Sequence, residues 1–232
     1  MKKKVLALTL GLTMALSLAA CGGNTGSSPS GSASASGSGA DASTSGSGSS
    51  GDLITVGFAQ VGHESDWRTA STKSAQDVFS EENGYQLSFI DCDNDSATQL
   101  EAVRGFIQQG VDYIIIDPIV STGWDAVLTE CDDAGIPVIV IDRTIDDSDK
   151  YVSWVGSDFK TEGLACGEWL KAYAEAKGIT EINALVIEGS TGASATIGRT
   201  EGFKEIADRE GWNILGSQSG DFTEAGGQEV MV

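Results

Sequence analysis

Residues 138–141 form the apolar run Val-Ile-Val-Ile, which directly follows Pro137. Consecutive β-branched residues of this kind predict a strand that is buried on both faces. Such strands belong to helix-covered parallel sheets, in which ligands bind just beyond the carboxyl ends of the strands. Asp142 and Arg143 stand at that position. Together they can bind a ligand with several hydroxyl groups, or they can form a surface ion pair, and these six residues leave both interpretations open.

The chain from Leu53 onward alternates predicted strands with predicted helices. Its strands are expected at 53–60, 85–90, 111–116 and 138–141, and its helices at 67–83, 97–109 and 122–133. This order predicts an α/β fold with a parallel sheet, right-handed crossovers and helices on both faces. The carboxyl ends of the strands then share one edge of the sheet. We therefore expect a ligand site there, built from the links 61–66, 91–96, 117–121 and the residues after 141.

A second run of elements follows an acidic loop. We expect helices at 159–176 and 195–210, strands at 182–187 and 212–216, and the opening of a further helix at 224–232. A two-stranded sheet is too small to cover the helices around it. The sequence therefore predicts a second lobe that is incomplete, as in a gene product truncated at its C-terminus.

The N-terminus is typical of a secreted protein. Lys2, Lys3 and Lys4 precede a mostly apolar stretch that ends in Leu-Ala-Ala-Cys21. This ending looks like the lipobox of bacterial lipoproteins, which implies cleavage before Cys21 and a lipid on its thiol; the alternative is an ordinary cleavage site. Residues 22–51 are almost all Gly, Ser, Ala and Thr, which predicts a disordered tether.

Charge and cysteine content narrow the function classes. The net charge is −20 and the only basic cluster is 2–4, which argues against nucleic-acid binding. Cys92, Cys131 and Cys166 show no C-x-x-C spacing. We expect buried free thiols, with a Cys92–Cys131 disulfide as the alternative.

Three further motifs are weak. Asp91, Asp93 and Asp95 have the spacing of a calcium loop but lack its Gly and its bidentate Glu, so a solvated acidic turn is favoured. The stretch 189–194 suits an anion at a helix N-terminus, although a tight turn is favoured over a phosphate site. No nucleophile–base constellation stands out, and we expect no catalysis, no metal and no cofactor.

The link after the first strand carries a carbohydrate-like pattern. Glu64, Asp66 and Arg68 flank Trp67, whose ring can cover the apolar C–H face of a sugar while the charges bind its hydroxyls. The alternative is that Trp67 packs into the core of the first helix. Because Asp142 and Arg143 are expected on the same edge, the ligand interpretation is favoured.

Many stretches of the chain resemble one family in order along the sequence. It is similar to the type I periplasmic sugar-binding proteins of ABC transporters, and within them most similar to galactofuranose-binding members. The matching stretches are 56–62 with 64–65 and 67–68, then 102–104, 109–112, 122–124, 136–138, 142–143, 192–194, Arg199, 202–203 and 217–223.

The resemblance implies two Rossmann-like lobes with parallel sheets, the second incomplete, that close on a monosaccharide such as a galactofuranose-like hexose or a pentose. It implies a signal peptide at 1–21, a tether at 22–51, an N-terminal lobe at 52–157 and a partial C-terminal lobe at 158–232. Its partners would be an ABC permease and, through Cys21, the outer face of the cell membrane, with the protein a monomer. The alternatives are a sensor that docks on a chemoreceptor or histidine kinase, and a small hydrolase. The implied ligand-binding residues are Glu64, Ser65, Asp66, Trp67, Arg68, Asp117, Asp142, Arg143, Arg199 and Phe222.

Overall fold

The computed structural model describes residues 53–232, so the predicted signal peptide, Cys21 and the tether lie outside the described residues. The elements in chain order are β1 (Ile54–Gln60), α1 (Asp66–Val78), η1 (Glu81–Asn83), β2 (Tyr85–Asp91), α2 (Ser96–Gln109), β3 (Tyr113–Ile116), α3 (Asp125–Asp133), β4 (Val138–Asp142), β5 (Ser153–Gly156), α4 (Phe159–Lys177), β6 (Asn183–Glu188), α5 (Ser194–Glu210), β7 (Asn213–Ser219) and α6 (Glu224–Val230). We call the part from β1 to β5 the first segment and the part from α4 to α6 the second segment.

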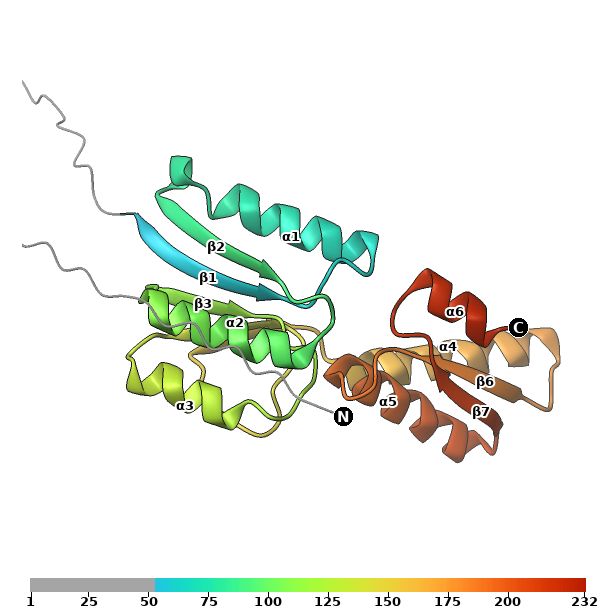
Figure 1. Ribbon diagram of the computed structural model, residues 1–232. Helices are drawn as coiled ribbons and strands as arrows, with labels where there is room; N and C mark the ends of the chain where they lie inside the picture. Colours follow the sequence, from blue (N-terminus) through green and yellow to red (C-terminus); the bar gives the residue numbers. More distant parts are fainter. Residues whose placement is uncertain (1–52) are drawn as a thin grey trace, which may run out of the picture. The chain divides into compact units, whose positions relative to one another are not determined.

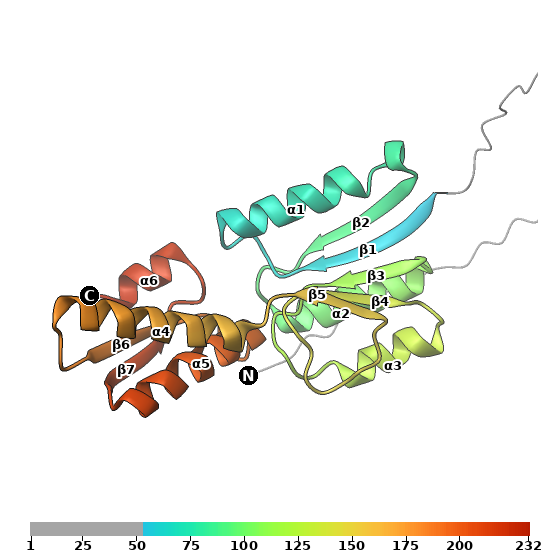
Figure 2. The same cartoon turned by 180° about the vertical axis from the view of Figure 1, so that it is seen from behind.

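The first segment is a five-stranded parallel sheet in the order β2-β1-β3-β4-β5. Helix α1 covers one face of the sheet, and α2 and α3 cover the other (Figures 1 and 2). The α/β class and the parallel sheet predicted from the sequence are thereby confirmed. Because all strands are parallel, their carboxyl ends meet at one edge, where β1 and β4 end at Gln60 and Asp142.

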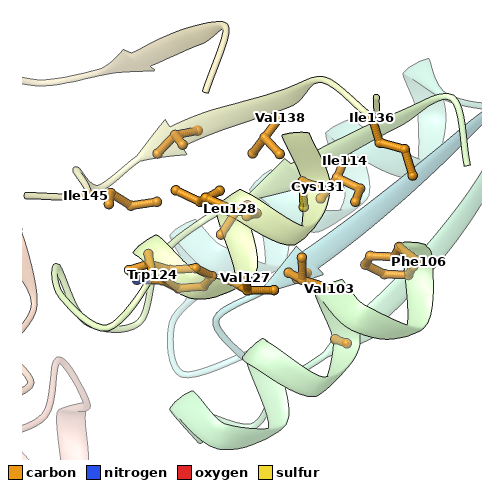
Figure 3. Close-up of a cluster of buried hydrophobic side chains, with 14 of the residues drawn as sticks. Val103, Phe106, Ile114, Trp124, Val127, Leu128, Cys131, Ile136, Val138 and Ile145 are labelled. Carbon is orange, nitrogen blue, oxygen red and sulfur yellow. The ribbon is translucent and has the colours of Figure 1, made fainter. Parts of the chain in front are cut away.

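The larger core lies between the sheet and the helices α2 and α3. Trp124 and Leu128 of the α3 region pack with Phe106 of α2 against Ile114 and Val138 of the sheet (Figure 3). Gly57 makes this packing feasible, because a Cβ on it would lie only 2.4 Å from Cγ of Phe106. The sheet, whose carboxyl edge is the expected place of the ligand site, is therefore fixed on this face by a closely packed core.

The opposite face of the sheet has a smaller core. Val56, Phe58 and Ile115 are buried there, and Ala75 and Phe79 pack against them. Helix α1 ends at Val78 with Phe79 as its C-cap, and a short 3₁₀ turn follows, so the prediction of one helix to Asn83 was wrong at its end. Ser80 and Asn83 explain the break, because the Asn83 amide donates to Asp77 O, Val78 O and Ser80 Oγ.

Strand β5 is the element that the sequence pattern missed. It is a four-residue edge strand whose Val155 is exposed, so it lacks the alternation of buried and exposed residues that signals a strand. Its pairing with β4, not its own sequence, defines it.

The second segment is built on the parallel pair β6–β7. Helices α4 and α5 pack closely against each other, because a Cβ on Gly163 would lie 2.2 Å from Arg199 O and one on Gly202 would lie 2.2 Å from Lys160 O. Leu185, Ile187 and Leu215 on the two strands are exposed. The predicted two-stranded sheet is therefore present, with apolar side chains left open to solvent.

The cysteines of the described part are all free. Cys92 and Cys131 are buried as expected, so the disulfide alternative was wrong, whereas Cys166 is exposed. Burial raises the pKa of the Cys92 thiol to about 12 and that of Cys131 to about 11. Within residues 53–232, none of the helices combines the length and the apolar character needed to cross a membrane.

Candidate ligand-binding site

A cavity of about 380 Å³ lies at the carboxyl edge of the first sheet and is bounded on its other side by the second segment. This volume is at the small end of the roughly 300–1,000 Å³ that is typical of ligand pockets. Its lining is largely polar and charged: Glu64, Ser65, Trp67, Arg68, Asp142, Arg143, Ser157, Phe159, Glu162, Ala195, Arg199 and Phe222.

Eight of the ten predicted ligand-binding residues line this cavity, and two do not. Asp66 is exposed in the first turn of α1, outside the lining. Asp117 is fully buried, with 0% of its surface exposed, and lies behind Arg68. The sequence thus selected residues that meet at one edge of the sheet but could not separate those that line the cavity from those beside or beneath it.

The start of α1 positions two of the lining residues. Ser65 is the N-cap of this helix, and its hydroxyl accepts a hydrogen bond from Arg68 N at 3.2 Å. Trp67 is 59% exposed, so the alternative that it packs into the helix core was wrong. Its ring lies 4.9 Å from the guanidinium carbon of Arg68, within the range of a cation–π contact.

Arg68 is the centre of a buried charge network. It is 3% exposed and binds a different carboxylate with each arm of its guanidinium. Nε donates to Glu64 at 3.1 Å, Nη2 donates to Asp142 at 3.2 Å, and Nη1 donates to Asp117. Asp142 therefore pairs with Arg68, and the alternative of an Asp142–Arg143 surface ion pair was wrong.

The network shifts the proton affinities of its members. Burial lowers the pKa of Arg68, but the negative charges of Asp117, Glu64 and Asp142 have the larger combined effect. The pKa of Arg68 is therefore raised, and its guanidinium stays protonated. Burial raises the pKa of Asp117 to about 7 against the opposing effect of Arg68. Burial thus brings the pKa of Asp117 close to neutral pH.

Arg143 forms the floor of the cavity beside this network. It is 3% exposed, and its Nη1 donates to the main-chain oxygens of Ile119 at 3.2 Å and Pro118 at 3.5 Å. The ring of Phe222 lies 5.1 Å from its guanidinium carbon. Burial lowers the pKa of Arg143, and the nearby Asp117 opposes that effect.

The second segment supplies the facing wall. Arg199 Nε donates to Glu162 at 2.8 Å, and the guanidinium lies 4.8 Å from the Phe159 ring. The Phe222 ring lies so close to Gly189 that a Cβ there would come within 1.9 Å of it. An aromatic face and a paired guanidinium thus stand opposite Arg68 and Arg143, which suits a ligand with hydroxyls at its edge and apolar C–H groups on its faces.

Two buried amides that the sequence reasoning missed hold the site together. Gln99 donates from Nε2 to Ala59 O and Asp117 O, and its Oε1 accepts from Ile119 N. Gln60 accepts from Arg68 Nη1 at 3.4 Å through the same Oε1 that binds Val61 N. Gln99 could have been found from the sequence, because it is a polar residue on the buried face of α2 that also carries residues 102, 103 and 106. Glu162 and Phe159 were also missed, because nothing local to them indicates their partner Arg199.

The two remaining motifs are structural turns. In the stretch 189–194, Gly192 O accepts from Ser121 N and Ser194 Oγ accepts from Thr144 N, so these groups join the two segments. Asp95 is the N-cap of α2, and Asp91 accepts from Asp93 N and bonds His63. Within the described residues no cluster of three or more candidate ligands is arranged to hold a metal.

A larger cavity of about 580 Å³ opens between β6, β7 and the helices of the second segment. Apolar side chains such as Leu185, Ile187 and Phe203 dominate its lining, and it meets the smaller cavity at Glu162, Arg199 and Phe222. We assign the ligand site to the smaller cavity, because the guanidinium groups of Arg68, Arg143 and Arg199 converge there from both segments.

Comparison with known proteins identifies the family. Residues 56–232 match the family model described as a periplasmic binding protein domain. The chain belongs to the periplasmic binding protein family. Members of this family are extracytoplasmic solute-binding proteins of transport systems, and the two-segment α/β architecture agrees with their structures.

Several members resemble the chain strongly over the same region. The galactofuranose-binding protein YtfQ of Escherichia coli is 44% identical over 181 residues, which are 77% of this chain and 56% of that protein. A ribose import binding protein of Bacillus subtilis is 32% identical over 69% of this chain and 51% of its own length. The chain therefore spans about half the length of the curated relatives it matches.

Solved structures of sugar-binding proteins also resemble the chain over about three quarters of its length. A Mycobacterium smegmatis protein in complex with β-D-fucofuranose is 47% identical with a TM-score of 0.72, over 77% of this chain and 59% of that one. The arabinose-transporter binding protein of Shewanella sp. ANA-3, bound to α- and β-L-arabinofuranose, is 41% identical with a TM-score of 0.69, over 76% and 58%.

Proposed function

We propose that the protein is an extracytoplasmic solute-binding protein that captures a monosaccharide between its two segments and delivers it to an ABC permease. The observation that carries this proposal is the convergence of Arg68, Asp142 and Arg143 with Arg199 and Phe222 on one cavity. Three guanidinium groups and an aromatic ring supply forked donors and an apolar surface, a combination that suits a polyhydroxylated ring. The relatives that bind galactofuranose, fucofuranose and arabinofuranose support a five-membered ring form.

Calorimetry on the full chain tests the ligand class. We expect binding of D-galactose, D-fucose or L-arabinose. Saturation-transfer NMR on the bound sugar then reports the ring form, because furanose and pyranose anomers have separate resonances. Signals from furanose forms support the proposal, whereas an absence of binding by every sugar would refute it.

The site itself is tested with Arg143→Ala. We expect the affinity to fall by roughly 10- to 100-fold, because hydrogen bonds to charged groups contribute about 1.5–3 kcal/mol. The matched control is Arg104→Ala, which removes an arginine paired with Glu130 on the surface away from the cavity. Unchanged affinity in Arg143→Ala would exclude this cavity as the binding site.

We also propose that the protein releases its ligand chemically unchanged, as transport requires. Sugar recovered after prolonged incubation with the protein should be identical to the sugar supplied, and a modified sugar would contradict this proposal.

No residue of the cavity specifically favours the alternative that the protein is a sensor. ATP hydrolysis by the reconstituted permease is the discriminating assay: stimulation by the sugar-loaded protein supports transport, and its absence favours a sensor.

Membrane anchoring belongs to this proposal as well. The Leu-Ala-Ala-Cys21 ending supports lipid attachment at the Cys21 thiol, with the folded part held outside the cell membrane by residues 22–51. Labelling cells with a radioactive fatty acid should mark the wild-type protein and not Cys21→Ser. Equal labelling of both would exclude this site.

A further inference from the structure

Asp117 differs from Glu64, Asp142 and Glu162 because it does not line the cavity. It follows β3 directly, is fully buried, and is absent from the cavity lining. One of its oxygens accepts from Arg68 Nη1, and its Oδ1 is buried without a hydrogen-bond partner. An isolated carboxylate is costly to remove from water, so its contact with Arg68 accounts for its place in the fold.

The carboxylates around Arg68 fall into two groups. The side chains of Glu64 and Asp142 are 11% and 20% exposed and line the cavity, whereas Asp117 holds the guanidinium from the side away from it. A ligand hydroxyl that binds Glu64 or Asp142 competes with Arg68 for their oxygens. A ligand in the cavity does not contact Asp117, so the ion pair between Asp117 and Arg68 persists when the site is occupied.

We propose that Asp117 is a positioning residue that holds Arg68 in its ligand-binding orientation and does not itself contact the ligand. This inference rests on the proposed function, because it assumes that Arg68 donates to a bound sugar. Gln99 sets the position of Asp117, since its amide donates to Asp117 O at 2.6 Å.

The charge on Asp117 connects this role to pH. The charged groups that face it are Glu64 and Arg68 from the α1 region and Asp142 and Arg143 from the β4 region; α2 contributes only the uncharged Gln99, and Glu162 and Arg199 lie across the cavity. Burial raises the pKa of Asp117 to about 7. The ion pair is therefore present above this value and is lost as the pH falls through it.

Calorimetry with L-arabinose and D-galactose at pH 8, 7 and 6 tests the consequence. If only the ionised form holds Arg68, the apparent Kd rises by up to about tenfold from pH 8 to pH 6, in proportion to the loss of the competent fraction. Titrations in buffers of different ionisation enthalpy should also show proton release on binding near pH 7. A wild-type affinity that is constant over this range would overturn the link to pH, and wild-type affinity in Asp117→Asn would overturn the positioning role.

Two variants separate Asp117 from other groups. Asp117→Asn keeps the shape of the side chain, and we expect weak binding without a pH slope and without proton release. His63→Gln removes the only histidine, which is exposed and outside the cavity lining, and should retain the wild-type slope. If Asp117→Asn retains the slope, or if His63→Gln abolishes it, Asp117 does not have the proposed role.

A measurement without sugar distinguishes this inference from the proposed function. The Nε–H NMR signal of Arg68, assigned by its disappearance in Arg68→Lys, should broaden as the pH falls through about 7. It should be broad at all pH values in Asp117→Asn. A failure of every sugar to bind would defeat the proposed function alone, whereas a sharp, pH-independent signal in both proteins would defeat the positioning role.

Discussion

Asp142 and Phe222 line the cavity on backbone that residues with side chains rarely adopt. Their φ angles are +57° and +58°, and Asp221, which precedes Phe222 in the chain, adds a third at +53°. Left-handed backbone costs on the order of 1 kcal/mol or more per residue and is concentrated at functional sites, where the surroundings enforce it. Hydrogen bonds stabilise this backbone here, because Arg68 Nη2 donates to Asp142 and Asp221 N donates to Ser219 Oγ.

Gln99 is the residue whose loss should affect the fold most directly. In Gln99→Leu, Asp117 O and Ile119 N lose their partner in the interior, and we expect a loss of about 3 kcal/mol in the free energy of unfolding. Urea denaturation measures this value. Gln76→Leu on the exposed surface of α1 is the control and should change the free energy by less than about 0.5 kcal/mol. Similar values for both variants would show that the Gln99 bonds are not stabilising.

His63 gives a test of the electrostatics at the rim of the sheet. Its Nδ1 lies 2.8 Å from Asp91 Oδ2, and this hydrogen bond, with the charge of Asp91, raises the pKa of His63 above 6.5. The His63–Asp91 pair is therefore complete below that pKa and weakens as the pH rises through it. Because the chain has one histidine, its proton NMR signal is unambiguous. Asp91→Asn should lower the titration midpoint, and an unaltered midpoint would contradict the pairing.

At the scale of elements, the crossing of α4 and α5 depends on glycine. Gly163 and Gly167 of α4 face Arg199 and Ile206 of α5, and no other residue type fits at these contacts. The same crossing places Glu162 next to Arg199, so close helix packing positions one wall of the cavity. Glycine within helices is usually unfavourable, and its retention here reflects the short distance between the two backbones.

Gly202→Ala and Gly105→Ala should therefore change the stability in opposite directions. Alanine at position 202 would place its Cβ 2.2 Å from Lys160 O, and we expect a loss of at least about 2 kcal/mol. Position 105 in α2 has open space around it, so alanine should add about 0.5–1 kcal/mol through helix propensity. Thermal melting of both variants compares them, and a stabilised Gly202→Ala would show that the helices can separate without cost.

Most elements were predictable because local signals determined them. Asp95 and Gly110 bracket α2 as N-cap and C-cap, and the apolar run of β4 indicated a strand. Its predicted burial on both faces was only partly right, because Val138 and Val140 are buried whereas Ile139 and Ile141 are half-buried. Strand β5 was not predictable, since an edge strand is defined by its neighbour. At the site, the sheet edge was predictable from strand order, but the burial of Asp117 behind Arg68 was not. Whether a carboxylate faces the ligand or an arginine behind it depends on contacts between residues 49 positions apart.

At the scale of the whole described chain, the two segments are connected at few points. The chain passes from β5 to α4 at Ser157 and Asp158, and two hydrogen bonds, Ser121 N to Gly192 O and Thr144 N to Ser194 Oγ, also join the two segments. The cavity is lined from both sides of this narrow connection. A ligand that contacts both walls would favour their closed arrangement, in the manner of hinge-closing proteins.

The pairing of charges within the cavity has a consequence for the medium in which the protein works. The chain carries a net charge of −20, yet Arg68 and Arg199 are each paired with carboxylates at the site. Mobile ions screen exposed charges over a Debye length of about 10 Å at 0.1 M but reach buried pairs much less. The Arg68 pairs are of the buried kind, whereas the Arg199–Glu162 pair is exposed. Because the sugar proposed as the ligand carries no charge, its capture should be nearly independent of ionic strength. We expect the Kd to change by less than about twofold between 0.05 and 0.5 M NaCl, with calorimetry as the measurement; a steep dependence would mean that unpaired surface charge governs binding.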